Sequence, residues 1–345
     1  MGIPPFPFAA PSIDETAPQM SGVALDEYGR DADVLAWFLL HRGGAAAARL
    51  LSSSTSQEAQ HKSPVLRWIE LLRNCAAGVE LPGVRGHELL TGGAYGSSAT
   101  LAAVVDFYAA RLCAWAVRRL ESEHASANIE FHVHGGFVTE ELAKRDSTNL
   151  AEPAIASGLG TLLVGAQLAS ERRGRIEIMG SGSPGLDIEW TVEAGLSIRV
   201  EHKAQAFSSA YRNASPSHDV LRNMWPQIVE KSGDLRRRTK ADGVPALCVI
   251  AFTGLYPWRL AEHLEKRDLR PDLAGAFAKA MPGKPDPYLM PHAALFNLYG
   301  IDGHVDGHGT YARRMGRAFP FPDARPRASK VLADLFETVF KRTAK

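Results

Sequence analysis

The first third of the chain has apolar residues at helical spacing. They recur every three or four positions over residues 33–51, 64–76 and 97–123, which is the period of a helix that buries one face. The longest stretch carries a continuous apolar stripe formed by Leu101, Val104, Val105, Tyr108, Leu112, Trp115 and Leu120. The pattern predicts a mostly helical region over residues 21–128, preceded by a loose, proline-rich N-terminus at residues 1–20.

Beyond residue 128 the period changes, and helical stretches alternate with runs typical of strands. We expect, in chain order, a strand end over 129–134, a helix over 151–170, strands over 175–179, 187–192 and 196–203, a helix over 217–238 and a strand over 245–252. Pro153 suits the first turn of the earlier helix, whereas Pro226 should kink or split the later one. The run PALCVIAF at 245–252 is apolar throughout, which predicts a strand buried on both faces.

These elements predict an α/β fold whose core follows the order helix, strand, strand, strand, helix, strand. The core should occupy residues 129–260, and residues 261–345 form a C-terminal extension. In and beside that extension the pattern is looser. We expect helices over 258–266 and 328–341 and a proline-rich loop over 281–292.

The strands over 187–192 and 196–203 form a predicted hairpin with one apolar and one polar face. Alternate side chains of a strand face opposite ways, so even-numbered residues must oppose even-numbered ones if both apolar sets share a core. The apolar face then holds Leu186, Ile188, Trp190, Val192, Leu196, Ile198 and Val200, and the polar face holds Asp187, Glu189, Thr191, Arg199, Glu201 and Lys203. The same parity requires three turn residues or a bulge near Gly195.

This register sets Asp187 across from Glu201 or diagonal to it, with facing Cβ atoms about 5 Å apart. Two carboxylates that close repel each other unless a cation lies between them. Mg²⁺ takes carboxylate oxygens, water and phosphate as ligands, and Lys203 on the same face could hold a water or stabilise a phosphate. The alternative is an amphipathic hairpin whose polar face meets only water.

The segments Pro184-Gly185-Leu186-Asp187 and Glu201-His202-Lys203 are separated by 13 residues, and together they resemble the signature of the PD-(D/E)XK nuclease superfamily. This is the fold of many restriction endonucleases. The resemblance covers about residues 130–260 and implies a restriction-endonuclease-like core. It also implies Mg²⁺, or Mn²⁺, held by Asp187 and Glu201, with Lys203 as the catalytic lysine. The proline is not adjacent to the aspartate, which departs from the pattern.

Many members of this superfamily carry a further acidic residue on the first core helix. Glu152 is the candidate here for a catalytic role, although it precedes Pro153 and should lie at the helix cap. Glu140 and Glu141 are rivals for the same role. Gln205 shares the face of Lys203 and could line the site.

The resemblance implies a Mg²⁺-dependent endonuclease that hydrolyses DNA. The sequence has no helicase or methyltransferase motif beside the hairpin, which favours a stand-alone restriction or defence nuclease. RNA stays open as a substrate, and cutting both strands would suit a homodimer. The alternative function is a non-catalytic nucleic-acid-binding or assembly protein on the same fold. A third alternative is an unrelated α/β protein with an amphipathic hairpin.

Composition and charge bear on the location of the protein in the cell more than on its function. Of the 345 residues 45% are hydrophobic and the net charge is +1, so no global field directs the protein to DNA or a membrane. Cys75, Cys113 and Cys248 form no C-x-x-C motif, which argues against a disulfide framework and fits a reducing cytoplasm. The N-terminus lacks the features of a signal peptide, and no apolar run approaches the roughly 20 residues of a membrane span. We expect a cytoplasmic protein.

The sequence contains no Walker A, G-x-G-x-x-G or G-x-S-x-G motif. It therefore gives no support for a motor, a dinucleotide-binding protein or a serine hydrolase.

Two basic stretches are candidate phosphate contacts. The first ends the helix over 217–238 with Arg236, Arg237 and Arg238, and the second lies within residues 303–345, where nine basic and four acidic residues occur. The basic residues of the second stretch that we single out are Arg313, Arg314 and Arg317. Either stretch could contact nucleic acid. Cations also suit a helix C-terminus without any ligand, and the second stretch could be simply a basic C-terminus.

Two further groups mix metal-capable side chains. The segment 302–308 places Asp302, His304, Asp306 and His308 on one side if it is extended, and a flexible polar loop is the favoured interpretation over a second metal site. His132 and His134 share a face near the strand end. Without a third ligand nearby, the two histidines favour a surface or capping role over a transition-metal site.

Overall fold

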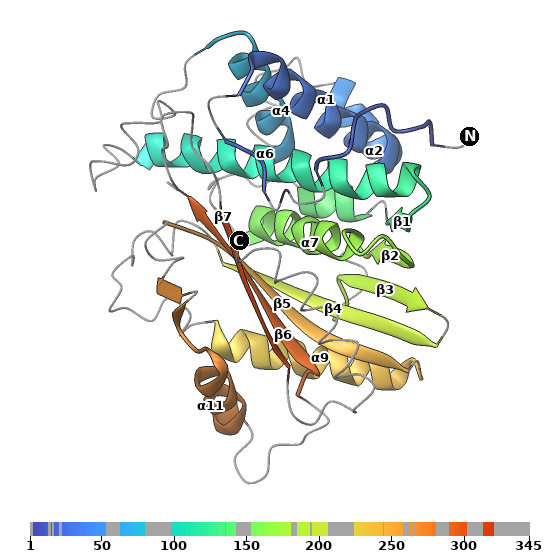
Figure 1. The fold of residues 1–345 in the computed structure, drawn as a ribbon, viewed down its shortest axis with the longest axis vertical. Helices are drawn as coiled ribbons and strands as arrows, with labels where there is room; N and C mark the ends of the chain where they lie inside the picture. Colours follow the sequence, from blue (N-terminus) through green and yellow to red (C-terminus); the bar gives the residue numbers. More distant parts are fainter. Residues whose placement is uncertain are drawn as a thin grey trace.

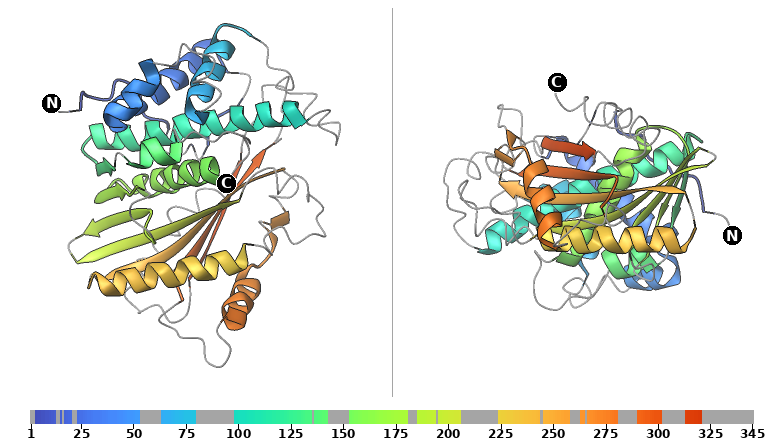
Figure 2. Two further views of the ribbon diagram at one scale, coloured as in Figure 1. Left: turned by 180° about the vertical axis from the view of Figure 1, so that it is seen from behind. Right: turned by 90° about the horizontal axis from the view of Figure 1, so that it is seen from below.

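The computed structural model describes the chain in separate segments. The described residues are 3–12, 15, 17–20, 23–52, 63–79, 98–134, 136–142, 153–180, 185–193, 195–205, 224–243, 245–257, 263–264, 266–280, 290–301 and 313–320. They form an α/β structure in which helices cover both faces of one mixed sheet (Figures 1 and 2). No helix among these residues is both long and apolar enough to cross a membrane.

In the middle of the chain the helices and strands occur in the order that the sequence pattern predicts. The helices are α1 (Leu25–Arg42), α2 (Gly44–Ser52), α4 (Pro64–Ala76), α6 (Ser98–Ala125), the π-helical turn η1 (Phe137–Leu142), α7 (Pro153–Ala169), α9 (Trp225–Ala241) and α11 (Arg270–Ala280). The strands are β1 (Glu130–Val133), β2 (Arg175–Ile178), β3 (Ile188–Glu193), β4 (Leu196–Gln205), β5 (Ala246–Pro257), β6 (Ala293–Ile301) and β7 (Arg313–Pro320).

The seven strands lie side by side in chain order. The pairs β2/β3, β3/β4 and β6/β7 are antiparallel, whereas β1/β2, β4/β5 and β5/β6 are parallel. Parallel neighbours need a crossover connection. The crossover from β1 to β2 contains α7, while those from β4 to β5 and from β5 to β6 contain α9 and α11 on the opposite face of the sheet (Figure 1).

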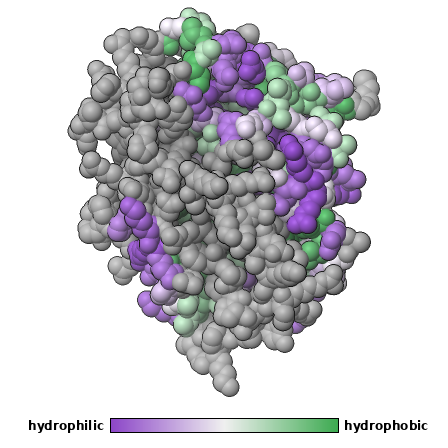
Figure 3. All heavy atoms as spheres, viewed as in Figure 1, coloured by the Kyte–Doolittle hydropathy of each residue, from purple (hydrophilic) through white to green (hydrophobic). Residues whose placement is uncertain are grey.

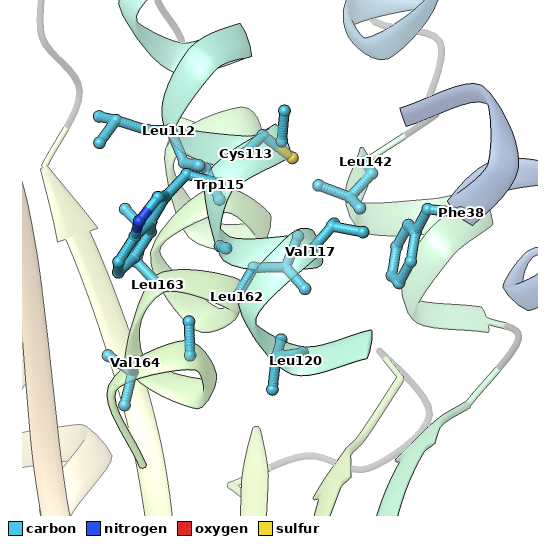
Figure 4. Packing of buried hydrophobic residues seen from close by; sticks show 14 of the residues in the cluster. Phe38, Leu112, Cys113, Trp115, Val117, Leu120, Leu142, Leu162, Leu163 and Val164 are labelled. Atoms are coloured by element: carbon cyan, nitrogen blue, oxygen red, sulfur yellow. The ribbon is translucent and has the colours of Figure 1, made fainter. Parts of the chain in front are cut away.

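Two hydrophobic cores result, one on each face of the sheet. The first lies between the sheet and α7, continues to α6 and reaches α1 and α4. Figure 4 shows its centre, to which α6 contributes Leu112, Trp115 and Leu120 and α7 contributes Leu162 and Leu163. The second core lies under α9 and α11. In β5, Val249 and Ala251 belong to the first core while Cys248, Ile250 and Phe252 belong to the second. The predicted burial of this strand on both faces is therefore confirmed.

Most of the predicted helices are present, with two instructive differences. The helix expected over 33–51 begins earlier, at Leu25, and is broken at Gly43, which closes α1 by donating its N–H to the carbonyl of Leu39. Gly44 follows with φ +64°, a conformation that costs glycine little. The expected kink at Pro226 is absent from α9, whereas the alternative, a split of the expected helix, depends on residues 217–223, which lie outside the described residues. Pro226 lies in the first turn of α9, where its missing N–H leaves no hydrogen bond unmade.

The N-terminal segment, expected to be loose, contacts the helical layer in its described part. The Phe6 ring packs edge-on against Trp37 with centroids 5.0 Å apart, and Met20 is fully buried. Arg119 and Arg111 of α6 donate hydrogen bonds to the carbonyl oxygens of Ser12 and Gln19. Arginines of α6 thus hold a segment whose described residues form no helix or extended strand.

Residues beyond 260 add to the sheet. β6 and β7 extend it to Pro320, although the sequence placed the core within residues 129–260 and gave residues 261–345 only helices and a loop. The expected helix over 328–341 lies outside the described residues. Figure 3 shows that the described surface on one side is largely hydrophilic, with small apolar patches.

We expect Gly160→Ala to lower the free energy of unfolding by about 2 kcal/mol. Gly160 lies in α7, and a Cβ atom there would overlap the His202 ring of β4. Gly275 of α11 is the matched control, because a Cβ there has open space. Gly275→Ala should raise the free energy of unfolding by up to about 1 kcal/mol through helix propensity. Urea unfolding measures both variants, and equal effects would contradict the close packing of α7 on β4.

Candidate functional site

The pairing of β3 with β4 has the predicted parity. Ile188 lies opposite Val200, Trp190 opposite Ile198, and Glu189 opposite Arg199. The register shifts between Thr191 and Glu193, next to Gly195 with φ +78°. The predicted bulge at this turn is therefore confirmed, and with it the rule that even-numbered residues oppose even-numbered ones.

One residue of the hairpin departs from its predicted face. Leu186 packs in the second core, whereas Ile188 packs in the first. The chain is not yet a regular strand here, because Gly185 has φ +78° and lies against the backbone of Asp234 in α9. The prediction that Leu186 shares the face of Ile188 is wrong for that reason. Asp187 stands between them, immediately before β3 begins.

The odd-numbered residues of β4 face α9. Glu201 forms an ion pair with Lys231 of α9, with 2.6 Å between Oε1 and Nζ. Arg199 forms another with Asp242 at the end of α9, also at 2.6 Å. Since β4 pairs with β5 without interruption from Ser197 to Gln205, Lys203 shares this face. Its positive charge acts on Glu201.

Asp187 is positioned by the backbone of β4. Its Oδ2 atom accepts a hydrogen bond from the N–H of His202 at 2.6 Å, and its own N–H donates to the carbonyl of Val200 at 2.9 Å. Its charge also acts on the Lys231 ammonium. The structure therefore brings Asp187, Glu201 and Lys203 together at the start of β3 and the middle of β4.

Glu201 is the most unusual of these groups electrostatically. Only 3% of its side chain is exposed, and its Oε2 atom is buried without a hydrogen-bond partner. Burial raises the pKa of its carboxyl group above the ordinary value, although the hydrogen bond and charge of Lys231 oppose the shift. A buried carboxylate oxygen without a donor costs free energy, and it is also the kind of atom that a hard cation binds.

His202 lies between Glu201 and Lys203 in β4, and its side chain is on the opposite face of the sheet. Its ring lies against Gly160, and its Nε2 atom is 2.8 Å from the Thr253 hydroxyl of β5. Burial, helped by the charge of Lys203, lowers the pKa of His202 to about 3, so the ring is neutral. Its side chain supports the packing of α7, while its backbone N–H holds Asp187.

Lys231 is the residue of the site that the sequence argument missed. The carboxylate pair predicted a cation, and in the structure an ammonium from α9 lies in the field of both acids. Burial alone would lower the pKa of Lys231, but the hydrogen bond and charge of Glu201 prevail and raise it, which keeps the ammonium charged. Its position 30 residues after Glu201 gives no local signal.

The described side chains contain no group of three or more histidine, cysteine, aspartate or glutamate residues able to hold a metal ion. Asp187 and Glu201 supply two carboxylates, which suits Mg²⁺ because it keeps several water ligands. The donor set thus fits a weakly held Mg²⁺ and does not fit a closed, all-protein cage.

Several candidate residues lie outside the described part of the chain. Glu152 and the segment 302–308 are among them. For six other candidates the backbone is described but the side chain is not; these are Glu140, Glu141, Gln205, Arg313, Arg314 and Arg317.

The three arginines of α9 all have polar contacts. Arg237 pairs with Asp234 at 2.6 Å, Arg238 lies 3.7 Å from Asp242, and Arg236 lies 3.0 Å from the His292 ring. The charges of Arg237 and Arg238 are thus partly balanced by neighbouring carboxylates. His132 on β1 is exposed as a whole residue. Partial burial of its ring, together with the charge of Arg175, lowers its pKa.

A separate open hollow of about 610 Å³ lies at the far end of β3. Its lining comes from the end of α6, the starts of β1 and β2, and residues 191–193. Asp187 lies at the opposite end of β3, so this hollow is not part of the carboxylate site.

We expect Glu201→Gln to leave the free energy of unfolding at pH 7.5 unchanged or to raise it by up to about 2 kcal/mol. The substitution removes a buried charge, and the lysine left behind is 36% exposed and hydrated. Glu121→Gln is the matched control, because Glu121 is buried and receives two 2.7 Å hydrogen bonds from Arg42. It should lower the free energy of unfolding by about 3 kcal/mol, since it leaves a buried arginine unpaired.

Urea unfolding of both variants distinguishes a site from a structural ion pair. A loss in Glu201→Gln as large as that in Glu121→Gln would show that the pair between Glu201 and Lys231 holds the fold together.

The candidate site is thus a cluster of two carboxylates and two ammonium groups on the α9 face of the hairpin, with one carboxylate oxygen unpartnered. Such a cluster can bind a hard divalent cation and a phosphate. Comparisons with protein-family models, curated proteins and solved structures give no match to this chain.

Proposed function

We propose that this protein is a Mg²⁺-dependent endonuclease that hydrolyses DNA phosphodiester bonds. The observation that carries the proposal is the convergence of Asp187, Glu201 and Lys203 on one face, with the buried Oε2 atom of Glu201 unpartnered. The order α7, β2, β3, β4, α9, β5 is the order of a restriction-endonuclease-like core, which supports the same proposal.

Asp187 and Glu201 would hold the Mg²⁺ ion, or Mn²⁺ in its place. A bound divalent ion lowers the pKa of a coordinated water and so supplies a nucleophile at neutral pH. Lys203 carries a charge that acts at Glu201, and its role would be to stabilise negative charge on the phosphate oxygens. His202 supports this arrangement because its backbone N–H fixes the Asp187 carboxylate.

DNA as the substrate is supported by the charge of α9 and the residue after it. Residues 225–242 contain five basic and three acidic side chains, so this element is positive although the whole chain is nearly neutral. Arg236, Arg237 and Arg238 would contact phosphates beyond the scissile one, and Arg313, Arg314 and Arg317 of β7 are the second group proposed for this role. A stand-alone restriction or defence nuclease, acting as a homodimer on two strands, fits the proposal.

A second candidate function is a non-catalytic nucleic-acid-binding or assembly protein with the same fold. The observation that favours it is the ion pair between Lys231 and Glu201, because an ammonium already neutralises the carboxylate that the metal would need. In that case the cluster would be a structural feature and binding would not depend on a divalent ion.

The test is cleavage of supercoiled plasmid in Mg²⁺ or Mn²⁺. We expect Asp187→Asn, Glu201→Gln and Lys203→Ala each to cut at least on the order of 100-fold more slowly than the wild type. Glu189→Gln is the matched control, because Glu189 lies on β3 and pairs with Arg199 away from the carboxylate cluster. It should keep its activity within about twofold, as expected for a substitution outside the reacting groups.

Cleavage that survives Lys203→Ala or the addition of EDTA would contradict the proposal. DNA binding that is insensitive to EDTA, with no cleavage by any variant, would favour the second candidate function.

A further inference from the structure

We infer that Lys231 occupies the cation position at Glu201 until a divalent ion displaces it, and that it thereby sets which cations the site accepts. This inference rests on the proposed metal-dependent function. Lys231 reaches Glu201 from α9 at 2.6 Å, bonding Oε1, and no other hydrogen bond reaches the carboxylate among the described residues, since Oε2 is unpartnered. The ammonium is thus the cation that offsets the burial of this carboxylate.

The charge balance of the cluster favours exchange of one cation for the other. Asp187 and Glu201 act on Lys231, and Lys203 is the second ammonium nearby. Asp234 also acts on Lys231, but it is paired with Arg237 at 2.6 Å, so this pair adds no net charge. The two carboxylates and two ammonium groups therefore sum to a net charge of about zero before a metal arrives. A divalent ion that replaces the Lys231 ammonium leaves a net charge of about plus one, whereas one added beside it leaves about plus two and strong repulsion at one carboxylate.

The difference in exposure between the two partners allows the Lys231 side chain to leave the ion pair. Its side chain is 36% exposed, whereas that of Glu201 is 3% exposed. A lysine ammonium on a flexible four-carbon stem can move into water without disturbing the helix. Glu201 cannot follow it, because its strand is paired on both sides. Displacement therefore moves only the lysine side chain.

The same geometry predicts a preference among cations. A monovalent ion would replace one positive charge by another and gain nothing in the cluster's charge, while it loses the hydrogen bond of the ammonium. A hard divalent ion gains a second charge against the carboxylates. Lys231 therefore excludes Na⁺ and K⁺ and raises the concentration of Mg²⁺ or Mn²⁺ that the site needs.

Mn²⁺ binding to the full chain, followed by the electron paramagnetic resonance signal of free Mn²⁺, tests the inference without any measurement of activity. We expect Lys231→Met to bind Mn²⁺ at least tenfold more tightly than the wild type. Lys231→Arg keeps a cation at Glu201 and should bind no more tightly than the wild type. Lys231→Gln is a second neutral variant that can still donate a hydrogen bond to Glu201, and it should also bind more tightly.

Lys240→Met is the matched control, because Lys240 lies on α9 and is exposed. It removes one positive charge from the same helix and should leave Mn²⁺ affinity within about twofold of the wild type, because an exposed charge at a distance is screened. An equal gain in Mn²⁺ affinity in Lys240→Met would show that the effect comes from the general electrostatic field of the helix, and it would overturn the inference.

The remaining outcomes separate this inference from the proposed function. If the wild type binds Mn²⁺ through Glu201, as shown by loss of binding in Glu201→Gln, and Lys231→Met binds with equal or weaker affinity, the inference is wrong and the nuclease proposal stands. If none of the variants binds Mn²⁺, both are wrong.

Discussion

The antiparallel pairing of β3 with β4 is the constraint on which the candidate site depends. Because Ile188 faces Val200 in this pairing, Asp187 must lie beside Glu201 and His202 at the start of the strand. The apolar even-numbered residues fix that register, since a shift of one residue would move Ile188 and Trp190 out of the first core. The acids are therefore held together by the burial of residues that have no chemical role.

The side chains on the two faces of β4 make different kinds of contact. On one face the His202 ring is enclosed by α7 and bonded to Thr253. On the other face Glu201 meets Lys231 with one oxygen left over. A fold gains nothing from an unpartnered buried carboxylate oxygen, whereas the buried pair of Arg42 and Glu121 satisfies both oxygens of its glutamate. This difference between two buried glutamates supports the proposal that Glu201 has a functional role, whereas Glu121 is expected to contribute to stability.

Local patterns predicted the hairpin, its parity and the order of core elements, because alternation and helical spacing are properties of neighbouring residues. They failed where the outcome depends on distant packing. Leu186 changes face because Gly185 turns against α9, and Lys231 reaches Glu201 only once α9 has docked. β6 was missed although residues 293–301 are largely apolar, since the prolines before them favoured a loop. The acid expected on the first core helix, Glu152, lies outside the described residues.

We propose that Asp187 and Glu201 share one cation position. Anomalous diffraction from crystals soaked in Mn²⁺ tests it most directly, because it locates the ion independently of any activity. Our account predicts a single strong peak within ligand distance, roughly 2–2.5 Å, of an oxygen of each carboxylate. A peak elsewhere with both carboxylates unliganded, or carboxylates that point to opposite faces of the sheet, would contradict it.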